Sequence, residues 1–220
     1  MVTFPRETDA YRAARNELLE SERDLRRQLE AVASQRRQLP LGGEIAEDYR
    51  FHDMSGDEVR FSQLFAGGRD TLIVYNYMYG PQMAQPCVMC TSILDGLDGE
   101  APHVQQRVNF AVVAKSPGER IHQFAQGRGW RYLPLYSSHG TTYNHDYHGE
   151  DEKGAQMPML NVFARRDGRI HHFYGTELLY AGSEAGQDGR HVDLIWPLWN
   201  LFDLTPDGRG TDWYPRLSYR

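Results

Sequence analysis

The sequence predicts an α/β fold in which helices cover both faces of one mixed β-sheet. Two β-branched and aromatic runs, Thr71 to Tyr77 and Val108 to Ala114, have the continuous apolar character of strands buried on both faces. A helical segment follows each run, so these two strands are expected to be parallel. Later in the chain, strand-like runs at 161–164 and 170–174 flank an Asp-Gly pair at 167–168, which is typical of a tight hairpin turn.

The N-terminal part of the chain predicts a helical extension. Residues 5–38 are rich in helix formers, and apolar residues recur at helical spacing, which indicates one long amphipathic helix or two shorter ones: Tyr11, Ala14, Leu18, Leu25, Leu29 and Val32. Pro40 with Gly42-Gly43 ends this segment. We therefore expect a helical extension over 1–40 and the main domain over 41–220. The apolar stripe suits packing against the main domain or, in a homodimer, against a second copy of the chain.

Weaker patterns complete the expected domain. A β-hairpin over 47–61, with its turn at Ser55-Gly56-Asp57, precedes the main sheet. A helix begins near Ser116-Pro117, and a third strand is expected over 130–136. The last element is a helix over 191–202, in which Pro197 is expected to cause a kink.

Composition limits the classes of partner. The chain has 220 residues and a formal net charge of −6, and no stripe of basic and aromatic residues that could follow a nucleic-acid backbone. Its N-terminus lacks the apolar core of a signal peptide, and no run approaches 18 apolar residues. We therefore expect no nucleic-acid partner and no membrane partner, and we expect the protein to lie in the cytoplasm.

The two cysteines are the strongest functional signal. Cys87 and Cys90 are the only cysteines, and their Cys-x-x-Cys spacing is typical of a redox dithiol. The pair follows a strand and precedes an expected helix, so Cys87 lies at a helix N-terminus, where the macrodipole lowers a thiol pKa below about 8.5. Cys87 is therefore the expected nucleophile, and Cys90 would resolve a mixed disulfide.

Two other interpretations of the cysteines remain open. They could be small buried hydrophobic residues without a chemical role. A structural zinc ion would need two further ligands from a set of histidines, several of them in a polar insertion over 137–156: His139, His145, His148, His171 and His172. Because neighbouring residues on a strand point to opposite faces, His171 and His172 cannot both reach one ion. No metal is predicted.

Residues 75–99, YNYMYGPQMAQPCVMCTSILDGLDG, resemble the thioredoxin-like proteins called domain of unknown function family 899, which are regarded as predicted dithiol–disulfide oxidoreductases. The resemblance continues in order through 49–65, 108–117, 127–138 and 157–178. It implies a thioredoxin-like fold with an N-terminal helical extension and hairpin, in which Cys87 and Cys90 form the redox pair.

The resemblance also implies roles for residues around the dithiol. It makes Pro158 a cis-proline that faces the dithiol, although trans is the commoner isomer at a proline. The backbone of Met157, just before that proline, would pair with an extended substrate. We also assign Pro86, next to the first cysteine, to substrate binding. One feature of thioredoxin is absent, because residues 71–86 contain no Asp or Glu to move the proton of Cys90.

The leading functional expectation is therefore a thiol–disulfide oxidoreductase. It would use the cysteine pair and no other cofactor, and it would act on a protein or small-molecule disulfide with an electron donor as second partner. A peroxiredoxin-like thiol peroxidase is one alternative, but it needs a hydroxyl three residues before the cysteine, where this chain has Ala84. A non-catalytic, dimeric interaction module is the other.

Overall fold

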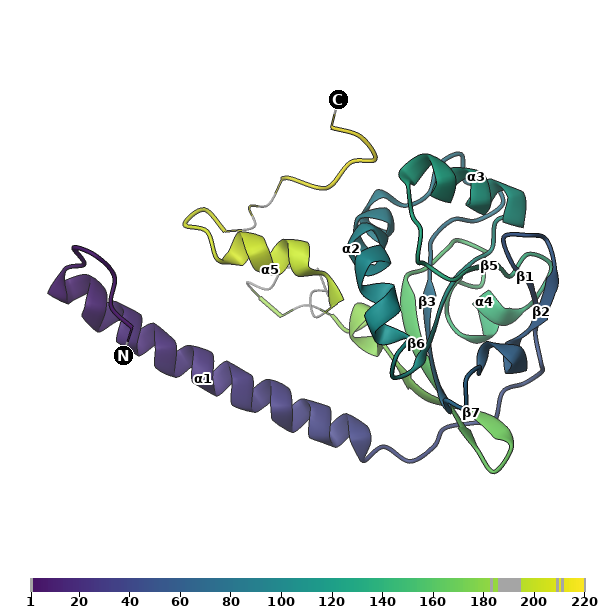
Figure 1. Ribbon diagram of the computed structural model, residues 1–220, viewed down its shortest axis with the longest axis horizontal. Coiled ribbons are helices and arrows are strands. Elements are labelled where there is room, and N and C mark those ends of the chain that lie inside the picture. Colours follow the sequence, from purple (N-terminus) through teal and green to yellow (C-terminus); the bar gives the residue numbers. More distant parts are fainter. Residues whose placement is uncertain (1, 183, 186–194, 209, 211, 220) are drawn as a thin grey trace. The chain divides into compact units, whose positions relative to one another are not determined.

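The computed structural model describes residues 2–182, 184–185, 195–208, 210 and 212–219 (Figure 1). The chain divides into two compact units, Met1–Pro40 and Leu41–Arg220. The first unit is built on one continuous helix, α1 (Asp9–Arg37). This helix begins after Thr8, whose side chain accepts a hydrogen bond from the Tyr11 backbone N–H at 3.2 Å. Such a cap satisfies one of the free N–H groups of the first turn.

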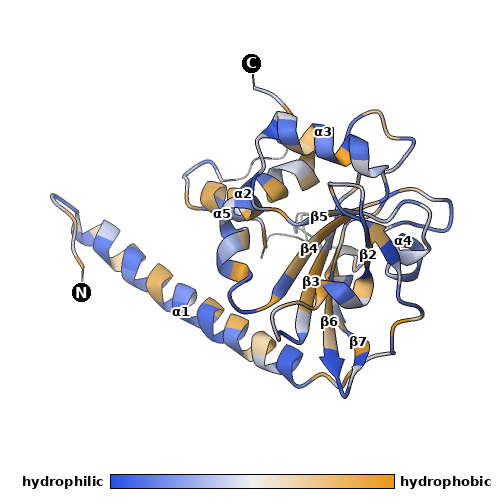
Figure 2. Cartoon of the chain, turned by 45° about the vertical axis from the view of Figure 1, so that its right-hand side comes forward, coloured by the Kyte–Doolittle hydropathy of each residue, from blue (hydrophilic) through white to orange (hydrophobic). Residues whose placement is uncertain are grey.

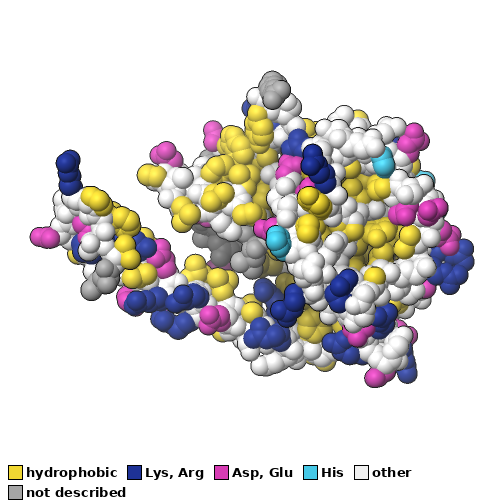
Figure 3. Space-filling model, viewed as in Figure 1, with side chains coloured by type: hydrophobic (Ala, Val, Ile, Leu, Met, Phe, Trp, Pro, Cys, Tyr) yellow, Lys and Arg dark blue, Asp and Glu magenta, His cyan; other side chains and the backbone are white. Residues whose placement is uncertain are grey.

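Charged side chains of both signs follow α1, as the space-filling view shows (Figure 3). Three ion pairs join residues three or seven apart along the helix: Arg15–Glu22, Arg23–Glu20 and Arg27–Asp24. Each exposed pair of this kind stabilises a helix by less than about 1 kcal/mol. These pairs place opposite charges beside each other, which explains how α1 carries many charges without repulsion between like charges. A homodimer in which α1 packs against a second copy of the chain stays a prediction.

The second unit is built around one sheet of seven strands, in the order β2-β1-β5-β4-β3-β6-β7. The strands are β1 (Arg50–His52), β2 (Glu58–Arg60), β3 (Thr71–Asn76), β4 (Asn109–Ala114), β5 (Leu135–Ser137), β6 (Met159–Arg166) and β7 (Arg169–Gly175). The central strands β3, β4 and β5 are parallel, whereas β6 and β7 form an antiparallel hairpin. The hairpin turns at Asp167 and Gly168, both with positive φ, as the Asp-Gly pair predicts.

Both faces of the sheet are covered. Alternate residues of β3 point into two separate cores: Ile73 and Tyr75 pack in one, and Leu72 and Val74 pack in the other. The helices α2 (Val88–Val104) and α3 (Gly118–Arg128) contribute to the first core. The short helix α4 (Tyr143–Asp146) contributes to the second. This arrangement explains why the central strands are mainly apolar, as their largely orange colour in Figure 2 shows.

The topology is that of a thioredoxin-like fold, as the sequence predicts. A parallel β3-α2-β4 unit is followed by α3 and β5, and the antiparallel β6-β7 hairpin adds to β3 on its other side. The β1-β2 hairpin joins the sheet through β5. This order brings the loop between β3 and α2, and with it Cys87, to the carboxyl end of a central strand.

The prediction of a strand over 130–136 is wrong for most of this range, since β5 begins only at Leu135. The cause is one carboxylate on α2. Asp98 Oδ1 accepts the backbone N–H groups of Arg131, Tyr132 and Leu133 at 2.8 to 3.1 Å. Backbone donors that are bound to this carboxylate cannot pair with a neighbouring strand. Asp98 thus holds the connection between α3 and β5 in an irregular conformation.

The C-terminal helix also differs from the expectation. The helix α5 (Pro197–Asp203) begins at Pro197, so this proline starts the helix and does not kink it. The first helical position suits proline because its missing N–H would have had no partner there. The expected residues 191–194 lie outside the described part of the chain. No helix among the described residues has both the length and the apolar character needed to cross a membrane.

Candidate active site

Cys87 is the N-cap residue of α2. Its sulfur accepts a hydrogen bond from the backbone N–H of Cys90 at 3.5 Å. Its carbonyl oxygen accepts from Thr91 twice, from the backbone N–H at 3.0 Å and from the hydroxyl at 2.8 Å. The sequence folds this way because Cys87 precedes a run of helix-compatible residues and its side chain can cap their free N–H groups. The Cys87 sulfur therefore faces the positive end of a helix.

The two thiols have opposite electrostatic environments, and both are free. A hydrogen bond from the Cys90 thiol and backbone N–H groups of the first turn lower the pKa of Cys87 to about 6, although partial burial opposes this. The hydrogen bond to Cys87 and burial raise the pKa of Cys90 well above its ordinary value. Cys90 is only 3% exposed. The pair thus combines an accessible thiolate with a buried thiol beneath it, which is an arrangement suited to thiol redox chemistry.

The loop before Cys87 is held in place from three sides. The backbone N–H of Cys87 donates to the Met78 carbonyl at 3.0 Å. Arg120 on α3 donates to the carbonyls of Pro81 and Met83 at 2.9 and 2.6 Å. The Ser116 hydroxyl donates to the Gly80 carbonyl at 3.2 Å. These contacts fix the position of Cys87 without any charged residue in the loop itself.

The structure places the other expected site residues as follows. Pro86 is buried directly before Cys87. Met157 and Pro158 are half-buried and directly precede β6, whose first residue Met159 pairs with Asn76, the last residue of β3. Pro158 therefore lies at the same edge of the sheet as the loop that leads to Cys87.

The expectation of a cis-proline is wrong, because the described residues contain no cis peptide bond. Pro158 thus has the isomer that is favoured at most prolines. The backbone before it is also occupied, since the Met157 N–H donates to the Gly149 carbonyl at 2.9 Å. Met157 can offer a substrate its carbonyl oxygen but not this N–H group.

A groove of about 650 Å³ lies beside the loop that precedes Cys87. Met78, whose carbonyl binds the Cys87 N–H, is one of the residues that line it, and the others include Met83, Lys115, Glu150, Lys153 and Gln156. Both lysines of the chain are in this set. The groove combines methionine side chains with charged groups of both signs, so it suits a ligand that is partly apolar and partly polar.

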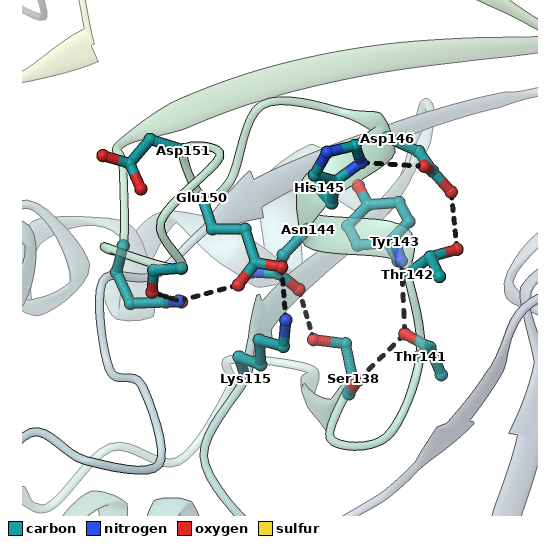
Figure 4. A network of polar contacts seen from close by, with 12 residues as sticks. Lys115, Ser138, Thr141, Thr142, Tyr143, Asn144, His145, Asp146, Glu150 and Asp151 are labelled. Atoms are coloured by element: carbon teal, nitrogen blue, oxygen red, sulfur yellow. Dashed lines mark hydrogen bonds and ion pairs between the residues drawn. The ribbon is translucent and has the colours of Figure 1, made fainter.

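The region expected to be a polar insertion, 137–156, contains buried polar contacts that the sequence did not reveal (Figure 4). Lys115 forms an ion pair with the buried carboxylate of Glu150, whose second oxygen accepts from Gln156 at 3.2 Å. The Ser138 hydroxyl donates to the buried side chain of Asn144. These contacts tie the segment to the strand β4 and to the groove. The polar composition of this segment gave no signal that its side chains would be buried.

Four of the five histidines considered as metal ligands have separate polar partners. His139 lies near the carbonyl of Lys115, His145 near Asp146, His171 near the carbonyl of Gly42, and His172 near Asn161. Within the described ranges, no group of three or more His, Cys, Asp or Glu residues is placed to hold a metal ion. The cysteine pair therefore has no histidine cluster beside it in that part of the chain.

Tyr75, Tyr77 and Tyr79 could have formed an aromatic platform near the dithiol. They are instead packing residues, at 1%, 1% and 6% exposure in the core under α2 and α3. The Tyr77 hydroxyl bonds the Thr91 hydroxyl at 2.8 Å, and the Tyr79 ring lies 4.9 Å from the Arg120 guanidinium. No flat aromatic surface is offered to a substrate by these three rings.

Comparisons with known proteins agree with the resemblance seen in the sequence. The chain matches, over residues 1–219, the family described as "Bacterial protein of unknown function (DUF899)". No curated protein sequence matches the chain.

Several solved structures are similar at low identity. A peroxidoxin, BcpB, from Mycobacterium tuberculosis is 18% identical, with a TM-score of 0.46 over 72% of this chain and 95% of that chain. Peroxiredoxin Q from Xanthomonas campestris is 14% identical, with a TM-score of 0.44 over 61% of this chain and 84% of that chain. A hypothetical protein from Sinorhizobium meliloti 1021 is 18% identical, with a TM-score of 0.44 over 81% and 91%.

Proposed function

This chain belongs to the DUF899 family, and we propose that it is a thiol–disulfide oxidoreductase whose redox group is the pair Cys87 and Cys90. The observation that carries the proposal is the N-cap position of Cys87, where helix N–H groups and the Cys90 thiol lower its pKa to about 6. A thiolate at neutral pH is the form of cysteine that attacks a disulfide. Cys90, three residues further along α2, is the second thiol that such an exchange requires.

The proposed reaction has two exchange steps. The Cys87 thiolate attacks one sulfur of a substrate disulfide, which forms a mixed disulfide and releases the first substrate thiol after it takes up a proton. Cys90 then loses its proton and attacks the Cys87 sulfur. The bond from Cys87 to the substrate breaks, and the second substrate thiol leaves with a proton. The substrate gains two electrons and two protons, and the protein holds a Cys87–Cys90 disulfide until an electron donor reduces it.

The partners in this proposal are a protein or small-molecule disulfide and a dithiol electron donor in the cytoplasm. No cofactor beyond the cysteine pair is needed, because both electrons come from the two thiols. We place the substrate beside the Met78 to Met83 loop, where the groove lies, with Pro86, Met157 and Pro158 forming the surroundings of the reacting sulfur. The carbonyl of Met157 is the group there that could pair with an extended substrate.

A direct comparison of two oxidants tests the proposal. Reduced protein is mixed with oxidised glutathione or with hydrogen peroxide under equal conditions, and formation of the Cys87–Cys90 disulfide is followed by intact mass and by released thiol. We expect the disulfide to oxidise the pair rapidly and to release two thiols per chain. Peroxide should react only as it does with an ordinary thiolate, because Ala84 offers no hydroxyl to orient it. Faster oxidation by peroxide than by the disulfide would contradict the proposal and support a peroxidase.

A further inference from the structure

The strand and loop that lead to the dithiol supply no carboxylate to assist the ionisation of the buried Cys90 thiol. Residues 71–86 contain no Asp or Glu, so the acid that thioredoxin places beneath its dithiol is missing. Burial and the neighbouring Cys87 both raise the pKa of Cys90. Yet Cys90 must become a thiolate to resolve a mixed disulfide. Another group in the surroundings of Cys90 must therefore stabilise its charge if the exchange is to run at neutral pH.

Tyr75 lies where such a group is needed. It comes from β3, one of the three parallel strands, and it packs in the same core as Cys90. The ring is only 1% exposed, and its hydroxyl has no hydrogen-bond partner of ordinary geometry among the described residues. A buried hydroxyl without a partner is costly, so one in a native core calls for a functional or structural explanation.

Tyr75 and Cys90 pack in the same core, and each shifts the pKa of the other, which places the Tyr75 hydroxyl near the Cys90 thiol. The Tyr75 hydroxyl lowers the pKa of Cys90, against the larger effects of Cys87 and of burial. Two tyrosines interact with the dithiol, Tyr75 on β3 and Tyr77 directly after β3, and the two cysteines act on each other. The Tyr77 hydroxyl is already bonded to Thr91, at 2.8 Å, so it is not free to serve Cys90.

We propose that Tyr75 is the hydrogen-bond donor that stabilises the Cys90 thiolate during the second exchange step, in place of a buried acid. Burial raises the pKa of the Tyr75 phenol, so the hydroxyl stays protonated and can donate throughout the reaction. The proton lost by Cys90 leaves with the departing substrate thiol, and Tyr75 keeps its own. This inference rests on the proposed oxidoreductase function, because only that function requires Cys90 to ionise.

Tyr75→Phe removes the hydroxyl and keeps the ring. In rapid-mixing experiments with oxidised glutathione, the first thiol release reports attack by Cys87 and the second reports resolution by Cys90. We expect the second release to slow by about tenfold at pH 7, the effect of losing one hydrogen bond to a charged sulfur, while the first is unchanged. The pH midpoint of the second release should rise by about one unit.

Tyr143→Phe is the matched control. Tyr143 is also fully buried with an unpartnered hydroxyl, but it packs in the core on the opposite face of the sheet. This variant should leave the rates of both thiol releases unchanged. It therefore shows whether an effect of Tyr75→Phe comes from the position of that hydroxyl or from the loss of any buried hydroxyl. Equal rates and equal pH midpoints for Tyr75→Phe and the native protein would overturn the proposal.

A second measurement separates this inference from the proposed function. In a Cys87→Ser background, alkylation of Cys90 with and without Tyr75→Phe reports the Cys90 pKa even if the protein reduces no disulfide. We expect the alkylation midpoint to rise by about one unit when the hydroxyl is removed. An unchanged midpoint would refute the role of Tyr75, whereas a raised midpoint in a protein that reduces no disulfide would refute only the oxidoreductase function.

Discussion

Replacing Cys87 by Ser is expected to abolish disulfide reduction by this protein, with the rate falling by about three orders of magnitude or more, as for other enzymes that lose their nucleophile. Serine keeps the size of the side chain and can still cap α2. Its hydroxyl does not ionise near neutral pH, however, so it cannot attack a disulfide. The measurement is the rate of thiol release from oxidised glutathione by the reduced protein.

Val88→Ala is the control for Cys87→Ser, because it changes the neighbouring side chain of the same helical turn and leaves both thiols intact. We expect it to retain the activity of the native protein. If Cys87→Ser kept more than a small fraction of the native rate, the nucleophile would have to be sought elsewhere, and Cys90 is the other cysteine of the chain.

Replacing Cys90 by Ser should have the second largest effect on disulfide reduction. It should stop the second exchange step and leave the first intact. Cys87 would still attack the substrate disulfide, but no thiol would remain to resolve the product. We therefore expect a stable mixed disulfide between Cys87 and glutathione, seen as one glutathione adduct per chain by intact mass. One thiol should be released for each chain, where the native protein releases two.

One result with Cys90→Ser would contradict this mechanism. The absence of a lasting adduct on Cys90→Ser would show that another thiol resolves the mixed disulfide. That thiol would be free glutathione, which regenerates oxidised glutathione with no net thiol release, or Cys87 of a second chain, which forms a disulfide-linked dimer. A dithiol mechanism within one chain would then be wrong, although Cys87 would keep its role as nucleophile.

Local patterns predicted the parts of the fold that depend on nearby residues. The run from Thr71 to Tyr77 became β3 because β-branched and aromatic residues suit a strand buried on both faces. The Asp-Gly pair became the turn between β6 and β7 because both positions need positive φ. The helix after the dithiol became α2, longer than the sequence indicated, since it extends to Val104.

Contacts between distant residues account for what the sequence did not predict. The strand expected from Trp130 fails because Asp98, more than thirty residues earlier, binds its backbone N–H groups. Lys115 and Glu150 are 35 residues apart and show no shared motif, yet they pair beside the groove. Tyr75 is an ordinary strand residue in the sequence, and only tertiary packing brings it into the same core as Cys90.

The pH dependence of Cys87 alkylation is the measurement that tests the central claim most directly. Reduced protein is treated briefly with iodoacetamide at pH values from 4 to 10, the reaction is quenched with acid, and the modified cysteine is identified by mass. With a Cys87 pKa of about 6, the rate should rise between pH 5 and 7 and then level off, since about nine-tenths of this thiol is ionised at pH 7. Cys90, whose pKa is raised, should stay unmodified across this range. A Cys87 midpoint near 8.5, the ordinary value for a cysteine, would show that the helix N-terminus and Cys90 do not activate this thiol, and it would contradict the account.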